Sequence, residues 1–197
     1  MGRFFTAYQT RIPTTGVVIE ADGVQVTSST APYRVALVAH LPGNLNSGNH
    51  HVYADVIDAN GQIVTNPPVR LGWTWNGRRV DEPAPPVALD KTSPADTASG
   101  NIEIHKGQTL SLWLQDGNDK FVSNIVSGLS TAISDADPAT GNSLWHNSFY
   151  VVFAPQASID TEPASPPIDC AECQRQLEVL RKQVDAIKQI LNNLTGD

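Results

Sequence analysis

Apolar and polar residues alternate along most of the chain up to residue 155. The alternation runs through short segments, from GVVIEADGVQV at residue 16 to SFYVVFAP at residue 148, which Gly, Asn and Asp separate. Period-two alternation between such turn residues is typical of β-strands. In VYADVIDANGQIV, apolar residues at alternate positions precede Asn60 and Gly61, a pair that predicts a β-hairpin turn. No helical period competes with this pattern between Arg3 and Pro155, so it predicts a β-sandwich.

The end of the chain has a different period. Apolar residues there are spaced alternately three and four positions apart: Leu177, Leu180, Val184, Ile187, Leu191 and Leu194. This spacing gives a heptad with apolar a and d positions, which predicts a parallel coiled coil formed by several copies of the chain. Ile187 is β-branched at a d position, and Ile190 widens the apolar stripe. These features favour a homotrimer, while leucine at most other positions leaves a tetramer open.

The two patterns divide the chain into three parts. Residues 1–154 are expected to form a single β-sandwich head, Ig-like or jelly-roll-like. Residues 155–168 are rich in proline and are expected to form an extended linker. Residues 169–197 are expected to form an oligomerising α-helical coiled coil. The predicted fold class is therefore mainly β, with a sandwich head followed by a C-terminal coiled coil.

The only cysteines, Cys170 and Cys173, fall at a and d positions of the same heptad register. The simplest interpretation is that they are two small core residues of the coil. Interchain disulfides are a second interpretation, because parallel helices in register bring the a and d thiols of different chains together. Zinc held by the four thiolates of two chains is a third. A redox centre is the least favoured, because no βαβ pattern surrounds the pair.

Composition narrows the choice of partners. Of the 197 residues, 40% are hydrophobic and 17% are charged, and the net charge is -7 with only 13 Lys and Arg. Nucleic acid is not an expected partner, because binding its backbone needs clustered positive charge. The segment MGRFFTAYQTRIP lacks the apolar core of a signal peptide, and no apolar run approaches the roughly 20 residues of a membrane span. The protein is expected to be made in the cytoplasm and to have no membrane partner.

No pattern in the sequence indicates catalysis. The chain has no Gly-x-Ser-x-Gly elbow, P-loop or dinucleotide fingerprint. Asp81 and Glu82 lie beside two arginines, so local ion pairing explains these acids. The adjacent His50 and His51 are expected to point to opposite faces of a strand, which would prevent them from holding one metal ion together. We therefore expect a non-enzymatic protein with no catalytic residues, no metal and no cofactor.

Trp73 and Trp75 alternate in LGWTWNG, so both are expected to face the same side of a strand. The simplest interpretation places them in the core of the sandwich or at its edge. The alternative is a ligand platform, because an exposed tryptophan face binds the C–H groups of a pyranose by apolar contact. This alternative would make the protein a carbohydrate-binding module that acts at a bacterial cell wall.

Several motifs occur in order between Tyr33 and Phe153: VAHLP, GNHHVYADVIDANGQIV, LGWTWNGRRVDEPAPPVALDK, GNIEIHKGQ, SNIVSGL and HNSFYVVF. Together they resemble a poorly characterised β-sandwich module of bacterial and phage-derived proteins, some of which carry lysozyme-like domains. The resemblance implies a phage or cell-wall setting and supplies no active site. With the predicted oligomer, it implies a phage virion component, either a capsid decoration protein or a short fibre. Such a protein would assemble in the host cytoplasm with other virion proteins, and cell-surface glycan is the further partner in the carbohydrate-binding alternative.

Overall fold

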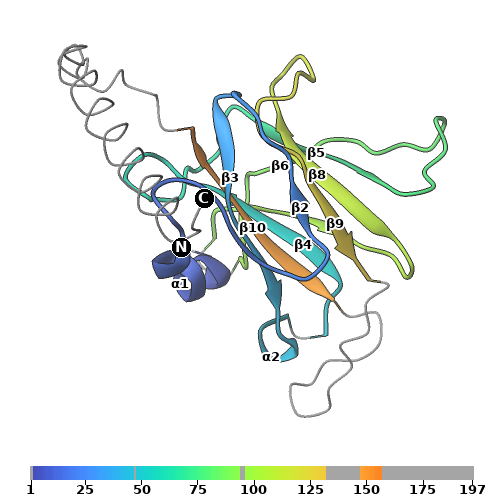
Figure 1. The fold of residues 1–197 in the computed structure, drawn as a ribbon, viewed down its shortest axis with the longest axis horizontal. Coiled ribbons are helices and arrows are strands. Elements are labelled where there is room, and N and C mark those ends of the chain that lie inside the picture. The colour runs from blue at the N-terminus through green and yellow to red at the C-terminus, as the bar shows by residue number, and fades with distance from the viewer. Residues whose placement is uncertain (1, 47, 94–95, 132–146, 157–197) are drawn as a thin grey trace, which may run out of the picture. The chain divides into compact units, whose positions relative to one another are not determined.

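Two five-stranded β-sheets form the body of the protein (Figure 1). The structure is a computed structural model and describes residues 2–46, 48–93, 96–131 and 147–156. Sheet 1 contains, in spatial order, β1 (Val18–Glu20), β3 (Tyr33–Leu41), β10 (Ser148–Pro155), β4 (His51–Val56) and β7 (Gly100–Glu103). Sheet 2 contains β2 (Gln25–Val26), β9 (Val126–Ser130), β8 (Thr109–Gln115), β5 (Arg70–Trp75) and β6 (Val87–Ala88). The pairs β1–β3 and β10–β4 are parallel, and the other neighbouring strands are antiparallel.

The main core lies between the facing sides of the two sheets. Strands contribute every second residue to it, as the predicted period requires: Val52, Ala54 and Val56 from β4, and Leu110, Leu112 and Leu114 from β8. All of these side chains are buried, with exposed fractions of 1% or less. The predicted mainly β character is therefore confirmed for the described residues, and the packing of the sheets is that of a sandwich.

The predicted turn at Asn60 and Gly61 is also confirmed. Gly61 has a φ of 74°, and its N–H donates a hydrogen bond of 3.0 Å to the carbonyl of Asp58. The Asp58 N–H in turn donates to the carbonyl of Gln62 at 2.8 Å. Glycine accepts a positive φ without steric cost, which is why this pair predicts a turn from sequence.

Strand β3 buries both of its faces. Its sequence YRVALVAHL is almost continuously apolar, and a β-bulge at Ala36 shifts its register against β10. As a result, Val35 and Val38 both face the main core, although they are three residues apart, while Leu37 faces the opposite side of sheet 1. A bulge inserts one unpaired residue and so reverses the alternation beyond it.

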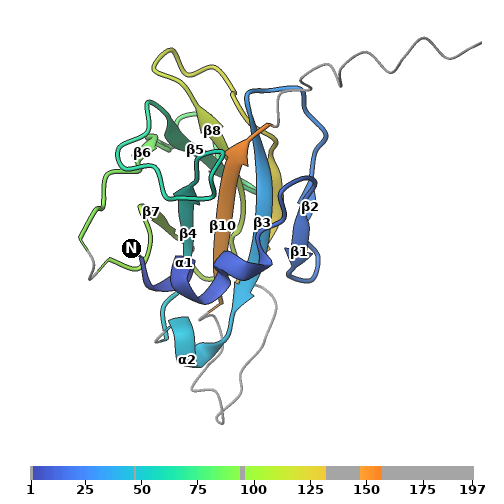
Figure 2. The same cartoon turned by 90° about the vertical axis from the view of Figure 1, so that its left-hand side faces the viewer.

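Helix α1 (Arg3–Tyr8) covers the outer face of sheet 1 (Figure 2). The ring of Phe4 is centred 4.7 Å from that of Tyr53, and the ring of Tyr8 lies 5.7 Å from that of Tyr150. A short 3₁₀ turn, η1 (Gln9–Arg11), follows the helix. The prediction of an entirely β region is therefore wrong at its start. Six residues are too few to show a helical period, and α1 is held by packing on the sheet more than by its own propensity.

The predicted fold class is wrong in its second part. The described residues contain only two short α-helices, α1 and α2 (Gly43–Asn46), and no helix among them is long enough for a coiled coil. Residues 157–197, which include most of the predicted linker, the whole predicted coil and both cysteines, lie outside the described residues. Apolar spacing alone does not make a long helix stable, because a heptad seam is stabilised only when it packs against a partner helix. The predicted homotrimer was based on residues 169–197, which lie outside the described residues, so it stays a prediction.

Candidate functional site

Trp73 and Trp75 both lie on the core side of β5, as their alternation predicts. Both are partly buried and pack against the main core. Their rings stack on each other, with centroids 5.2 Å apart and planes at 29°. Each ring therefore covers part of the other, an arrangement expected for core residues at the end of a sandwich. The ligand platform at these two residues stays a prediction.

The β5–β6 loop, residues 76–86, is fastened to this pair of tryptophans. Trp73 Nε1 donates a hydrogen bond of 2.9 Å to the carbonyl of Pro85. The guanidinium group of Arg78 lies 5.6 Å from the centre of the Trp75 ring, within the range of a cation–π contact. The loop extends away from the two sheets (Figure 1). These contacts give it a fixed base although it projects from the sandwich.

The tip of the β5–β6 loop is ordered by its own hydrogen bonds. Arg78 Nε donates to the Glu82 carbonyl at 2.9 Å, and the Arg79 N–H donates to Glu82 Oε2 at 2.9 Å. Arg79 and Asp81 form an ion pair of 2.5 Å, which lowers the pKa of Asp81 and confirms the predicted local pairing of this acid. Between them, Val80 is 101% exposed. The loop thus presents one apolar side chain between two charges that neutralise each other.

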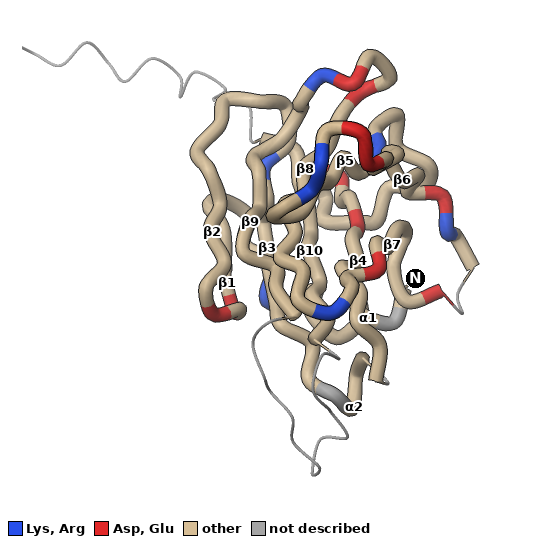
Figure 3. The backbone as a smooth tube through the Cα atoms, turned by 90° about the vertical axis from the view of Figure 1, so that its right-hand side faces the viewer, with Lys and Arg blue, Asp and Glu red and all other residues tan. Residues whose placement is uncertain are grey.

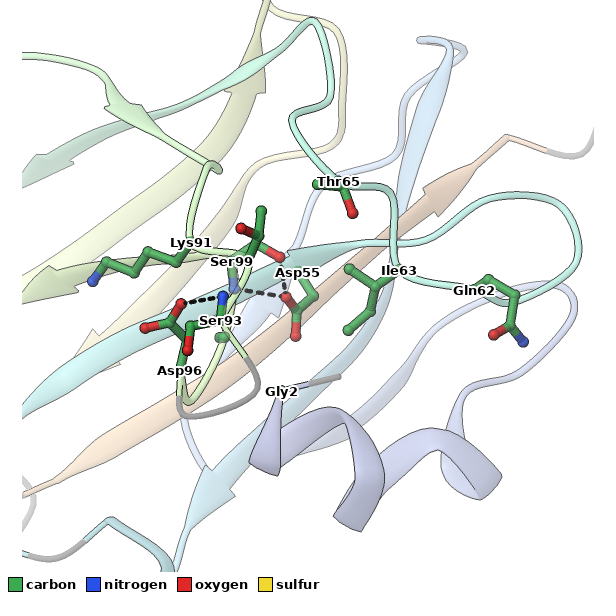
Figure 4. A pocket seen from close by; sticks show the side chains of 11 residues that line it. Gly2, Asp55, Gln62, Ile63, Thr65, Lys91, Ser93, Asp96 and Ser99 are labelled. Atoms are coloured by element: carbon green, nitrogen blue, oxygen red, sulfur yellow. Dashed lines mark hydrogen bonds between the residues drawn. The ribbon is translucent and has the colours of Figure 1, made fainter.

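A pocket of about 200 Å³ opens beside α1, between the β4–β5 and β6–β7 loops (Figure 4). Several of its polar groups bond within the protein. Asp96 Oδ2 accepts the Ser93 N–H at 2.8 Å, and Lys91 Nζ donates to Asn101 Oδ1. These bonds hold the β6–β7 loop in place and do not converge on a common point, as the polar groups of a ligand site do.

Asp55 of β4 is the buried carboxyl group of this pocket, with an exposed fraction of 0%. Its Oδ1 accepts the N–H and the hydroxyl of Ser99 at 2.7 and 2.5 Å, and its Oδ2 accepts the Tyr150 hydroxyl at 2.6 Å. Burial, and then the neighbouring Asp55, raises the pKa of Tyr150 well above its ordinary value. Both oxygens of this buried carboxyl group are thus hydrogen-bonded within the protein. We assign it a structural role, joining β4, β10 and the start of β7.

The adjacent histidines lie side by side, so their predicted placement on opposite faces is wrong. Strand β4 begins at His51, and His50 precedes it and is not bound by its alternation. The two rings stack with centroids 5.6 Å apart and planes at 22°. His50 Nε2 lies 2.9 Å from Glu103 Oε1, and His105 Nδ1 lies 3.7 Å from the same atom. Within the described ranges, no group of three His, Cys, Asp or Glu side chains is placed to hold a metal ion.

The ring of His51 is expected to make stability depend on pH. Burial is the largest cause that lowers the pKa of His51 below its ordinary value of 6.5, and the neighbouring His50 and Lys91 lower it further. Glu103 has a smaller effect that raises this pKa. Its Nδ1 is buried and has no hydrogen-bond partner among the described residues. The unfolded chain therefore binds this proton at a higher pH than the folded protein does. Neutral His51 contributes stability above pH 6.5 that is lost as the pH falls below that value.

Thermal unfolding between about pH 7.5 and 5 tests this expectation. The Tm of the wild-type protein should fall over this range, and the fall should be smaller in the His51→Gln variant. His105→Gln is the control, because the His105 side chain is 67% exposed. Equal falls in the wild type and in His51→Gln would contradict the prediction.

No helix among the residues that the structure describes is long and apolar enough to cross a membrane.

Comparisons with known proteins do not link the chain to a known family. Searches against protein-family models, curated proteins and solved structures found no match. The function must therefore be argued from the residues of this chain.

Proposed function

We propose that this protein is a non-enzymatic structural component of a phage virion and that its β5–β6 loop docks onto another virion protein. The resemblance of residues 33–153 to a module of phage-derived proteins supports the setting. The observation that carries the proposal is the tip of the loop, where an ordered turn holds Val80 fully in solvent. In this setting the protein would assemble in the host cytoplasm.

The loop has the properties of a docking element. Its turn is already fixed by hydrogen bonds, so binding costs little further conformational entropy. Burying the Val80 side chain would contribute about 1.5 to 3 kcal/mol. The Arg79–Asp81 ion pair leaves the tip without net charge. The partner surface that fits this tip is an uncharged apolar pocket rimmed by hydrogen-bonding groups.

Quantitative mass spectrometry of purified particles tests the proposal. The wild-type protein should be present at a fixed number of copies per particle. Val80→Asp should lower its incorporation by about tenfold or more, because the docked valine would be replaced by a charge that must lose its water. Val17→Asp is a matched control, because Val17 is also exposed, at 41%, but precedes β1 in sheet 1.

The outcomes separate the two parts of the proposal. Absence of the wild-type protein from particles would exclude the virion role. Equal incorporation of the wild type and Val80→Asp would exclude docking through the loop while the virion role stands. A carbohydrate-binding module remains the second candidate function, because the surface of sheet 2 carries an aromatic site of its own.

A further inference from the structure

The outer face of sheet 2 is polar around one large ring, that of Trp113. The leucines of β8 point into the main core, so the residues between them, Ser111 and Trp113, face outward. Hydroxyl side chains of neighbouring strands lie in register on this face, with Thr74 opposite Ser111 and Ser111 opposite Ser127. In Figure 3, which shows the molecule from this side, charged residues lie mostly in the loops. The face therefore combines hydroxyl groups and an aromatic ring with little charge.

The indole of Trp113 lies across Gly72, its neighbour on β5. A Cβ atom at Gly72 would be 2.1 Å from Trp113 Nε1 and 2.4 Å from Cε2, so the ring occupies the space of the missing side chain. Nε1 donates a hydrogen bond of 3.2 Å to Gln115 Oε1, which fixes the orientation of the ring. Trp113 remains partly exposed in this position. Glycine thus lets the sheet backbone support an aromatic ring at its surface.

Phe121 adds a second ring at a right angle to the first. It lies in the segment between β8 and β9, where an isolated antiparallel bridge pairs it with Gln115, and it is 53% exposed. The centroids of the Trp113 and Phe121 rings are 4.9 Å apart, with their planes at 86°. The two rings form an aromatic corner on an otherwise polar surface.

Hydrogen-bonding groups stand beside this aromatic corner. Gln115 donates from Nε2 to Asp119 Oδ1, and Arg70 Nη2 lies 3.8 Å from the same oxygen. The side chains of Arg70 and Asp119 are 44% and 71% exposed, so both keep bonding capacity toward solvent. Their opposite charges neutralise each other. The hydroxyl groups of Thr74 and Ser111 lie further along the same face, on the other side of the Gly72–Trp113 pair.

We propose that the aromatic corner and its polar neighbours form a binding site for a neutral glycan of β-linked, gluco-configured pyranoses. These sugars carry equatorial hydroxyl groups and present apolar C–H faces, which pack on an aromatic ring as apolar side chains do. The hydroxyl groups at the edge of the sugar ring would meet Arg70 and Asp119. The ion pair favours a neutral sugar over an acidic one. The site differs from the predicted platform at Trp73 and Trp75, and it does not depend on the virion proposal.

Calorimetric titration with cellohexaose and with chitohexaose tests the site and distinguishes glucose from N-acetylglucosamine. The wild-type protein should bind at least one of them. Trp113→Ala should weaken that binding by about tenfold or more. Phe121→Ala should weaken it as well, and this variant is expected to fold because the ring is already half exposed. Val17→Ala is the matched control, because it removes an exposed apolar side chain that precedes β1 in sheet 1.

Three results would overturn the proposal. The first is that the wild-type protein binds neither oligosaccharide. The second is that Trp113→Ala and Phe121→Ala, verified as folded by thermal unfolding, bind as tightly as the wild type. The third is that Trp73→Ala loses binding while Trp113→Ala retains it, which would place the site at the stacked pair on β5.

Discussion

Replacing Asp55 with alanine is expected to lower the free energy of unfolding by about 3 to 5 kcal/mol, because unmade hydrogen bonds of buried donors cost about 1 to 3 kcal/mol each. The variant leaves the N–H and hydroxyl of Ser99 and the hydroxyl of Tyr150 without their acceptor. Tyr150 is itself 0% exposed, so water cannot replace that partner without opening the cluster beneath α1. Urea unfolding followed by tryptophan fluorescence measures the change.

Two further variants define the cause. Asp55→Asn keeps the size of the side chain and one acceptor for Ser99, so its loss should be smaller than that of alanine. Asp58→Ala removes an aspartate from the adjoining turn, where the side chain accepts only the exposed N–H groups of Asn60 and Gln62. The loss there should be about 1 kcal/mol or less. If Asp55→Ala costs no more than Asp58→Ala, the structural role of Asp55 is excluded.

Replacing Gly128 with alanine is expected to cost about 3 kcal/mol or more. Gly128 is the unpaired residue of a β-bulge in β9 and has a φ of 85°. A side chain in this backbone conformation costs about 1 to 3 kcal/mol in strain. In addition, the new Cβ atom would lie 2.2 Å from the carbonyl oxygen of Gly23, which precedes β2. Because that contact is with backbone, β2 would have to move away from β9.

Gly77→Ala separates the two contributions to this loss. Gly77 has a similar φ of 76°, but a Cβ atom there would meet nothing within 4 Å. Its replacement should therefore show the cost of backbone strain alone. The difference between the two variants in urea unfolding measures the clash with Gly23. Equal losses would show that β2 adjusts to the new side chain without cost.

Period-two alternation predicted the strands well where one face of a strand is buried in the main core. It placed Val52, Ala54 and Val56 correctly, and it put Trp73 and Trp75 on a common side. It failed where burial depends on a distant part of the chain. Asp55 has the sequence position of an outward-facing polar residue, yet it is fully buried and accepts a hydrogen bond from Tyr150, on which α1 packs. A single sequence does not show that a six-residue helix will cover that face.

The surface sites were harder to predict for a related reason. Trp113 matters because it crosses Gly72, and that contact depends on the register between β8 and β5, whose residues are about forty positions apart. Nothing in the sequence near Trp113 specifies this register. Val80 was one apolar residue in a proline-rich segment, and only the hydrogen bonds of its turn show that it is held in solvent. The paired arginine and aspartate beside it were predictable because ion pairs between near neighbours are local.

The position of β10 constrains the order in which the protein can fold during synthesis. This strand lies between β3 and β4, which are not hydrogen-bonded to each other, and it is the last strand of the described chain. A ribosome that has not yet released residues 148–155 therefore holds a chain whose β3 and β4 have no strand to join them. Long-range pairing of this kind is slow, and unpaired apolar strands associate readily with other chains. Sheet 1 of the nascent protein closes only when β10 has left the ribosome. The nascent protein is therefore most exposed to aggregation in the interval before β10 is released.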